Sequence, residues 1–188
     1  MWDGFLTVLA ILLESVTWWY APTVILLWGI HRWKSPYRTQ ALRMLYATNT
    51  LLLYHSIVWS ITFLIAWAGP MLMALSDGRA AMAYLPDNGI QFILTSFISF
   101  LIGLIPLVFL RREWRIRFAV SLIIIAVNWL WKWVLDAVEH GHIRLMPGTN
   151  LESIVLYLLV FAGLLFLVYL LTRKRYAAFT AQAEVLNP

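Results

Sequence analysis

The sequence predicts an all-α integral membrane protein, a helical bundle of about five transmembrane helices with its N-terminus outside and its C-terminus inside. Composition is the first reason. Of 188 residues, 62% are hydrophobic and 12% are charged, whereas soluble domains average about 45–50% apolar and about 25% charged residues. The mean hydropathy is +0.79. A soluble core of this size cannot hold the excess apolar side chains, so we expect lipid to cover them.

The second reason is the length of the apolar runs. A helix rises about 1.5 Å per residue and the hydrocarbon core is about 30 Å thick, so a span needs about 20 apolar residues. Each run reaches that length and exceeds the roughly 9–11 residues of a barrel strand. No linker-like stretch divides them, so we expect one transmembrane domain, with residues 173–188 as a cytoplasmic tail. The five runs are residues 5–30, 42–67, 90–110, 118–138 and 151–172.

The third reason is the placement of the basic residues. They collect after the first, third and fifth runs, while the second and fourth connections carry few charges, mostly acidic. Arginine and lysine accumulate in cytoplasmic loops. This rule places the N-terminus outside and the C-terminus in the cytoplasm, and it requires an odd number of spans. The basic residues concerned are His31, Arg32, Lys34, Arg38, Arg43, Arg111, Arg112, Arg115, Arg117, Arg173, Lys174 and Arg175.

Composition and motifs exclude several classes of function. The chain has no cysteine, so disulfides and thiolate sites are excluded. Its net charge of +5 and its pI near 9.7 come from bases beside the spans, which indicates membrane orientation rather than nucleic-acid binding. There is no GxGxxG, P-loop, GxSxG, HExxH or EF-hand pattern. We predict no cofactor.

The first run contains one acid, Glu14, about 13 Å below the outer boundary if the helix enters at Phe5. An ionisable group at that depth is costly in lipid, so neighbouring segments must satisfy it. One interpretation is a structural carboxyl that holds the bundle together. The other is a proton or cation relay, or an acid/base group. Pro22 in the same run is expected to kink the helix or weaken its hydrogen bonding.

Two further ionisable groups lie at a similar depth, His55 in the second run and Lys132 in the fourth. His55 either bonds to a neighbouring helix or takes part in chemistry. Haem would need a second histidine at this depth, and the sequence offers none. Lys132 either extends outward toward Asp136 or joins a site. Glu14, His55 and Lys132 are therefore the candidate catalytic residues.

The third run carries Thr95, Ser99 and Gly103 at four-residue spacing. Such a row of small residues lets another helix approach closely. The approaching helix can belong to this chain or to a partner subunit. All five runs thus place a polar group in one layer of the outer half. These groups are Glu14, His55, Ser99, Asn128, Lys132 and Tyr157.

The fourth connection holds the densest group of possible metal ligands. Imidazoles and carboxylates suit zinc or copper, but the spacing matches no known metal motif, and a solvated acidic loop explains it equally. These weak candidates are Asp136, Glu139, His140 and His142.

Three functions fit these observations. The first is a subunit, accessory protein or assembly partner of a larger membrane complex. The second is a small transporter or channel subunit that uses Glu14 as proton or cation carrier. The third is an intramembrane enzyme acting on a lipid or a quinone. We expect the partners to be the lipid bilayer and other membrane-protein subunits or further copies of this chain. The membrane is expected to be a plasma membrane or a bacterial inner membrane.

Overall fold

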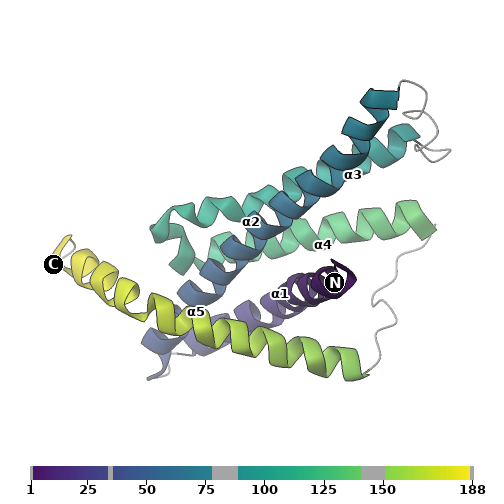
Figure 1. Ribbon diagram of the computed structural model, residues 1–188. Coiled ribbons are helices and arrows are strands. Elements are labelled where there is room, and N and C mark those ends of the chain that lie inside the picture. The colour runs from purple at the N-terminus through teal and green to yellow at the C-terminus, as the bar shows by residue number, and fades with distance from the viewer. Residues whose placement is uncertain (1, 34–35, 78–88, 141–150, 187–188) are drawn as a thin grey trace.

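In the parts of the chain that it describes, residues 2–33, 36–77, 89–140 and 151–186, the computed structural model contains helices and no strands. Side-chain positions are described for residues 4–33, 36–67, 94–135 and 152–177. Five elements are α-helices, and two short 3₁₀-helices join the third of them to the fourth (Figure 1). The elements are α1 (Trp2–Arg32), α2 (Arg38–Asp77), α3 (Gly89–Leu104), η1 (Ile105–Leu110), η2 (Arg112–Ile116), α4 (Phe118–His140) and α5 (Leu151–Leu186).

Four of these helices contain segments long and apolar enough to cross a membrane, and a fifth apolar segment is shorter. The expectation of an all-α membrane bundle is therefore confirmed. The long segments are Gly4–Arg32, Arg38–Trp67, Phe118–Leu135 and Glu152–Ala177, and the shorter one is Leu94–Leu110.

The two ends of the bundle differ in the chain segments that they contain (Figure 1). One end holds the α1–α2 turn, the η1–η2 hairpin and the C-terminal part of α5, and with them the basic clusters. We call it the basic end. The other holds the start of α1, and we call it the N-terminal end. The positive-inside rule predicts that the basic end faces the cytoplasm.

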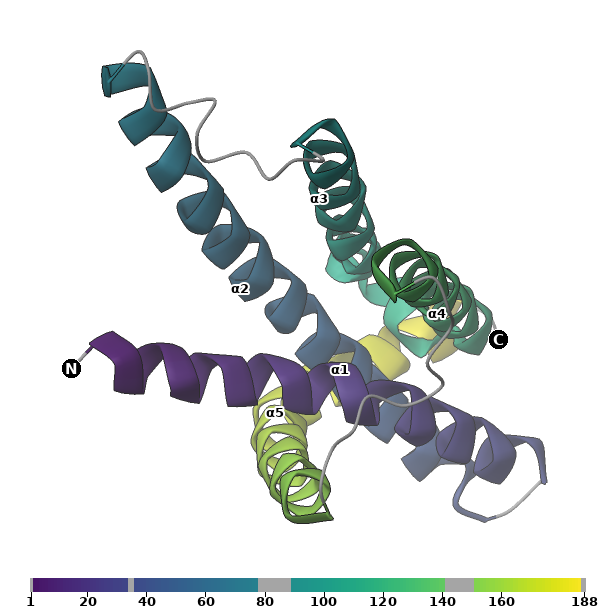
Figure 2. The same cartoon turned by 90° about the vertical axis from the view of Figure 1, so that its right-hand side faces the viewer.

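The helices are not all parallel. Figure 2 looks onto the N-terminal end, and there α3, α4 and α5 are seen nearly along their axes while α1 and α2 run across the picture. Helix α2 is the central element, because it packs against α1, α3, α5 and both 3₁₀-helices. The helices therefore meet around α2 and diverge toward the N-terminal end.

The core lies in the half of the molecule nearer the basic end. The most deeply buried apolar side chains are Val24 of α1, Leu45 and Tyr46 of α2, Phe109 of η1 and Ile124 of α4. By contrast, α1 before Ser15 and α5 before Phe161 have no fully buried side chain in the described part. Packing within the chain is thus concentrated at one end of the bundle.

Several hydroxyl side chains within the apolar helices bond to their own helix. Hydroxyl groups donate to the carbonyl four residues earlier, as Thr48 does to Met44 at 2.8 Å and Thr50 to Tyr46 at 2.7 Å. Ser60 and Thr172 repeat the arrangement. This local bond satisfies the hydroxyl without a partner helix, which explains why so many serines and threonines fit into apolar spans.

The third run departs from the uninterrupted helix predicted over residues 90–110. Helix α3 ends at Leu104, and Pro106 occupies the first turn of η1. Proline has no N–H to donate and its ring clashes with the carbonyl four residues earlier, so the α-helical ladder stops there. The chain continues in the tighter 3₁₀ form to Leu110.

Two helices continue beyond the spans that the sequence predicts. The second span is expected to end by Gly69-Pro70, with residues 71–75 able to continue as a short helix, and α2 runs as one helix to Asp77. Membrane helices tolerate proline where neighbouring groups accept the freed carbonyl. Helix α5 likewise continues beyond the predicted span, through the tail to Leu186. Its alanines, glutamine and glutamate are good helix formers, so nothing stops the helix.

Candidate functional site

A buried polar cluster lies at the basic end, centred on Asn49 of α2. Asn49 has no exposed surface. Its carbonyl oxygen accepts from the Tyr20 hydroxyl of α1 at 2.8 Å, and its amide donates to the Ser121 hydroxyl of α4 at 2.9 Å. The same amide donates to the Arg115 backbone carbonyl of η2 at 2.7 Å. One side chain therefore joins four elements.

Arg115 extends from η2 into the same region. Its Nε donates to the Phe109 carbonyl at 2.6 Å, and one terminal nitrogen lies 3.2 Å from the Tyr46 hydroxyl and 3.3 Å from that of Thr50. All three acceptors are neutral. Hydrogen bonds to a charged group contribute roughly 1.5–3 kcal/mol each when buried. Arg115 thus closes the η1–η2 hairpin onto α2.

An alternating series of arginine and tyrosine side chains connects this cluster to α5. The Arg115 guanidinium lies 5.3 Å from the ring centre of Tyr46, which meets the Tyr176 ring edge-on at 5.7 Å. The Arg43 guanidinium lies 5.7 Å from the centre of the same Tyr176 ring. These cation–π and aromatic contacts fix α2, α5 and the hairpin to one another.

The predicted site residues lie at the other end. Glu14 of α1 is exposed, and its carboxylate accepts a hydrogen bond from the Tyr157 hydroxyl of α5. A carboxylate and a phenol in contact can share or release a proton, which is chemistry suited to a relay. The pair also ties the N-terminal parts of α1 and α5 together.

His55 and Lys132 meet α1 at neighbouring positions. Nε2 of His55 lies 3.4 Å from the Thr17 hydroxyl. The Lys132 ammonium lies 4.9 Å from the ring centre of Trp18, a cation–π contact. Lys132 is exposed. The side chain of Asp136, its expected partner, lies outside the described residues.

Glu14, Thr17 and Trp18 lie three and four residues apart, so they occupy one face of α1. This face therefore meets α5, α2 and α4 in turn. Among the described side chains, no hydrogen bond or ion pair joins Glu14, His55 and Lys132 to one another. They form three separate pairs along one helix rather than one catalytic cluster.

The row of small residues on α3 faces two neighbours. The Ser99 hydroxyl accepts from the Trp131 indole of α4 at 2.9 Å, and the Gly103 carbonyl accepts from the Ser56 hydroxyl of α2 at 2.5 Å. A methyl group added at Gly103 would collide with the Trp59 ring. Thr95 has an interaction partner too. Both neighbours of Ser99 and Gly103 belong to this chain.

The possible metal ligands of the fourth connection cannot be placed. The side chains of Asp136, Glu139 and His140, and the whole of His142, lie outside the described residues. Elsewhere in the described chain, no three His, Asp or Glu side chains come together as a metal site would require.

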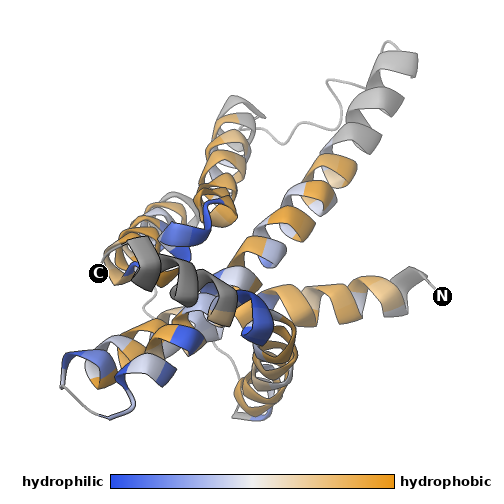
Figure 3. Cartoon of the chain, turned by 90° about the vertical axis from the view of Figure 1, so that its left-hand side faces the viewer, coloured by the Kyte–Doolittle hydropathy of each residue, from blue (hydrophilic) through white to orange (hydrophobic). Residues whose placement is uncertain are grey.

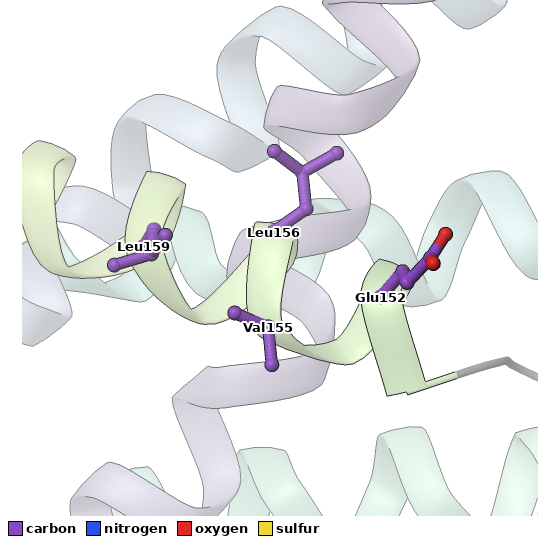
Figure 4. Close-up of a pocket in the computed structure, with 4 residues that line it drawn as sticks. All are labelled: Glu152, Val155, Leu156 and Leu159. Atoms are coloured by element: carbon purple, nitrogen blue, oxygen red, sulfur yellow. The ribbon is translucent and has the colours of Figure 1, made fainter.

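An open hollow of about 410 Å³ lies along the first turns of α5 (Figure 4). Val155, Leu156 and Leu159 line it together with Glu152. All four side chains come from one helix and leave it in different directions. The hollow is a shallow apolar surface, and it offers a polar substrate only one carboxylate.

The sequence reasoning missed the cluster at the basic end. It placed Asn49 on the second span and counted Arg115 only as a positive-inside residue. A signal was present, because an asparagine within an apolar span must find partners on other helices. Arg115 carried no such signal, since its neighbours Arg111, Arg112 and Arg117 have the same residue type.

Comparison of the chain with protein-family models, with curated proteins and with solved structures finds no match.

Proposed function

We propose that the protein is a subunit or accessory partner of a larger membrane complex, and that its partner binds at the N-terminal end. One observation carries this proposal. Glu14 and Lys132 are exposed on helices that are apolar enough to lie in lipid. An exposed lysine or acid within a span is costly, by about 2.5–3.5 kcal/mol at the bilayer centre on insertion scales. A partner helix with hydrogen-bonding groups would remove that cost.

The arrangement of the helices supports the same proposal. At the N-terminal end the helices diverge (Figure 2), and their side chains there are mostly exposed. The exposed apolar residues include Ile61 of α2 and Trp129 of α4. Apolar surface around a few polar groups is the composition expected of a helix–helix interface in a membrane.

Photocrosslinking in native membranes tests this proposal. A photoreactive amino acid at Trp129 should give a protein adduct, and one at the equally exposed Leu171 near the basic end should not. The adduct at Trp129 should be lost in Glu14→Gln and Lys132→Gln. It should persist in Glu113→Gln and Lys174→Gln, which remove the same charges from exposed positions at the basic end. An adduct insensitive to Glu14 and Lys132 would contradict the proposal.

The contact between Glu14 and Tyr157 favours a second candidate, a transport subunit in which Glu14 carries a proton or cation. In liposomes, Glu14→Gln should then abolish proton-coupled flux, while Glu113→Gln leaves it unchanged. Equal flux in both variants would reject Glu14 as the carrier.

A further inference from the structure

The η1–η2 hairpin exposes an unusual concentration of positive charge. Residues 111–117 contain four arginines and one acid, Glu113. Arg115 is turned inward and held by neutral acceptors of η1 and α2. Arg111, Arg112 and Arg117 remain exposed. Figure 3 shows this hydrophilic stretch on the face of the molecule at the basic end.

The backbone of the hairpin orders these side chains. The Trp114 N–H donates to the Arg111 carbonyl at 3.1 Å, and the Arg117 N–H donates to the Trp114 carbonyl at 3.2 Å. Helix η2 spans Arg112–Ile116, and Arg111 and Arg117 flank it with extended backbone, each three residues from Trp114. The result is a row of arginine, tryptophan and arginine.

The central residue of this row is anchored in the protein. Trp114 is half-buried and packs against the apolar core. The Arg111 guanidinium lies 5.7 Å from the centre of its ring. Trp114 therefore contacts the core and leaves part of its ring exposed, as expected of a tryptophan at a membrane interface.

The exposed guanidinium groups have no negative partner in the described part of the chain. The side chains of Arg112 and Arg117 make no hydrogen bond or ion pair there, and Arg111 has only the indole contact. Glu113 is also exposed and balances at most one of them. Guanidinium groups bind oxyanions through two parallel hydrogen bonds, above all carboxylate and phosphate.

We propose that the row of Arg111, Trp114 and Arg117 binds the phosphate of an anionic phospholipid. The two arginines contact the headgroup oxygens, and the indole lies against the glycerol and upper acyl region. Lipid fits better than a soluble anion because the row connects two apolar segments, Leu94–Leu110 and Phe118–Leu135. Basic pockets between helices at the cytoplasmic face bind such headgroups. Arg115 is a positioning residue, because it fixes the hairpin that carries the row.

Lipid titration followed by native mass spectrometry tests this inference on the whole chain in neutral detergent. The protein should retain phosphatidylglycerol in preference to phosphatidylcholine. The double variant Arg111→Gln/Arg117→Gln should bind phosphatidylglycerol about tenfold to thirtyfold more weakly, because it loses two charge-assisted contacts to the phosphate. The control Lys174→Gln/Arg175→Gln removes equal charge at the same end but leaves the row intact, so its binding should stay within about twofold.

Three results would overturn the inference. Equal losses in the two double variants would mean a general electrostatic effect. Retention of phosphatidylglycerol by Arg111→Gln/Arg117→Gln would mean that the row does not bind it. Displacement of the lipid by millimolar inorganic phosphate would mean a site for a soluble anion. Because these side chains are exposed, circular dichroism should show the same helix content in all variants.

One further variant tests the role of the indole. Trp114→Leu keeps the charges and the apolar packing but removes the ring. It should weaken phosphatidylglycerol binding while leaving the discrimination against phosphatidylcholine in the same direction, because the arginines remain. Unchanged binding would remove Trp114 from the proposed site. The test does not depend on the partner protein, since only lipid is added.

Discussion

The two ends of the bundle use polar residues in opposite ways. At the basic end, Asn49 is fully buried and bonds to groups on α1, α4 and η2. At the N-terminal end, Glu14 and Lys132 are exposed, and each has one contact on one other helix. Asn49 holds several elements of the fold together, whereas Glu14 and Lys132 each make a single exposed contact.

The difference follows from the backbone. At the basic end the α3–α4 connection leaves the α-helical ladder, so its carbonyl groups need other donors. Non-helical backbone at membrane depth is tolerated only when protein groups satisfy it. Asn49 and Arg115 supply those donors to Arg115 and Phe109. At the N-terminal end the described segments are α-helices, so most of their carbonyl groups are satisfied within the helix itself.

The largest expected effect is that of Asn49→Leu. The substitution leaves the Arg115 carbonyl and the Tyr20 hydroxyl buried without their partner, so we expect a loss of about 2–4 kcal/mol in unfolding free energy. Asn128→Leu is the control, because Asn128 is exposed and bonds only to the Ile124 carbonyl of its own helix. It should change stability by no more than about 0.5 kcal/mol. Unfolding by SDS in mixed micelles measures both, and equal losses would remove the distinction between the two ends.

A smaller effect is expected at Gly103, between the two ends. Gly103→Ala should destabilise by about 1–3 kcal/mol, because the added methyl group meets the Trp59 ring and displaces α3 from α2. Gly163→Ala on α5 has open space around the new methyl group. It should be neutral or slightly stabilising, since alanine is the better helix former. A neutral Gly103→Ala would show that α3 can move away from α2 without cost.

The smallest effect on stability is expected from Glu14→Gln and Tyr157→Phe. Both change one exposed contact, so each should alter the unfolding free energy by less than about 1 kcal/mol. Their effect should instead appear in partner crosslinking or in flux. A loss as large as that of Asn49→Leu would mean that the N-terminal end also depends on its polar groups for folding.

The sequence predicted the helices better than it predicted their ends. Runs of apolar residues showed where the long helices lie, because burial in lipid needs only length and composition. It missed the end of α3 before Pro106. Pro70 lies within the continuous helix α2, whereas Pro106 lies in the first turn of η1, directly after the end of α3. Proline is thus tolerated in one helix and accompanies the end of another. What decides is whether neighbouring groups accept the freed carbonyl, which is a tertiary property.

The candidate site divides in the same way. Counting residues predicts a similar depth for Glu14, His55 and Lys132, since helical rise is nearly constant. Their contacts with Tyr157, Thr17 and Trp18 could not be predicted in this way. Packing sets the rotation of each helix about its axis and the crossing of α1 over the other helices. The sequence also could not show that Arg115 turns inward, because the η1–η2 hairpin contains four arginines.

By itself, the sequence determined that this chain is helical, apolar enough for a membrane and basic at alternate connections. These properties follow from composition and periodicity, which each segment carries independently. Only the tertiary structure decided that Asn49 and Arg115 hold the η1–η2 hairpin against α2 while Glu14 and Lys132 stay exposed. The reason is that hydrogen-bond partners are chosen among groups far apart in the chain, and their choice depends on how the helices rotate and cross.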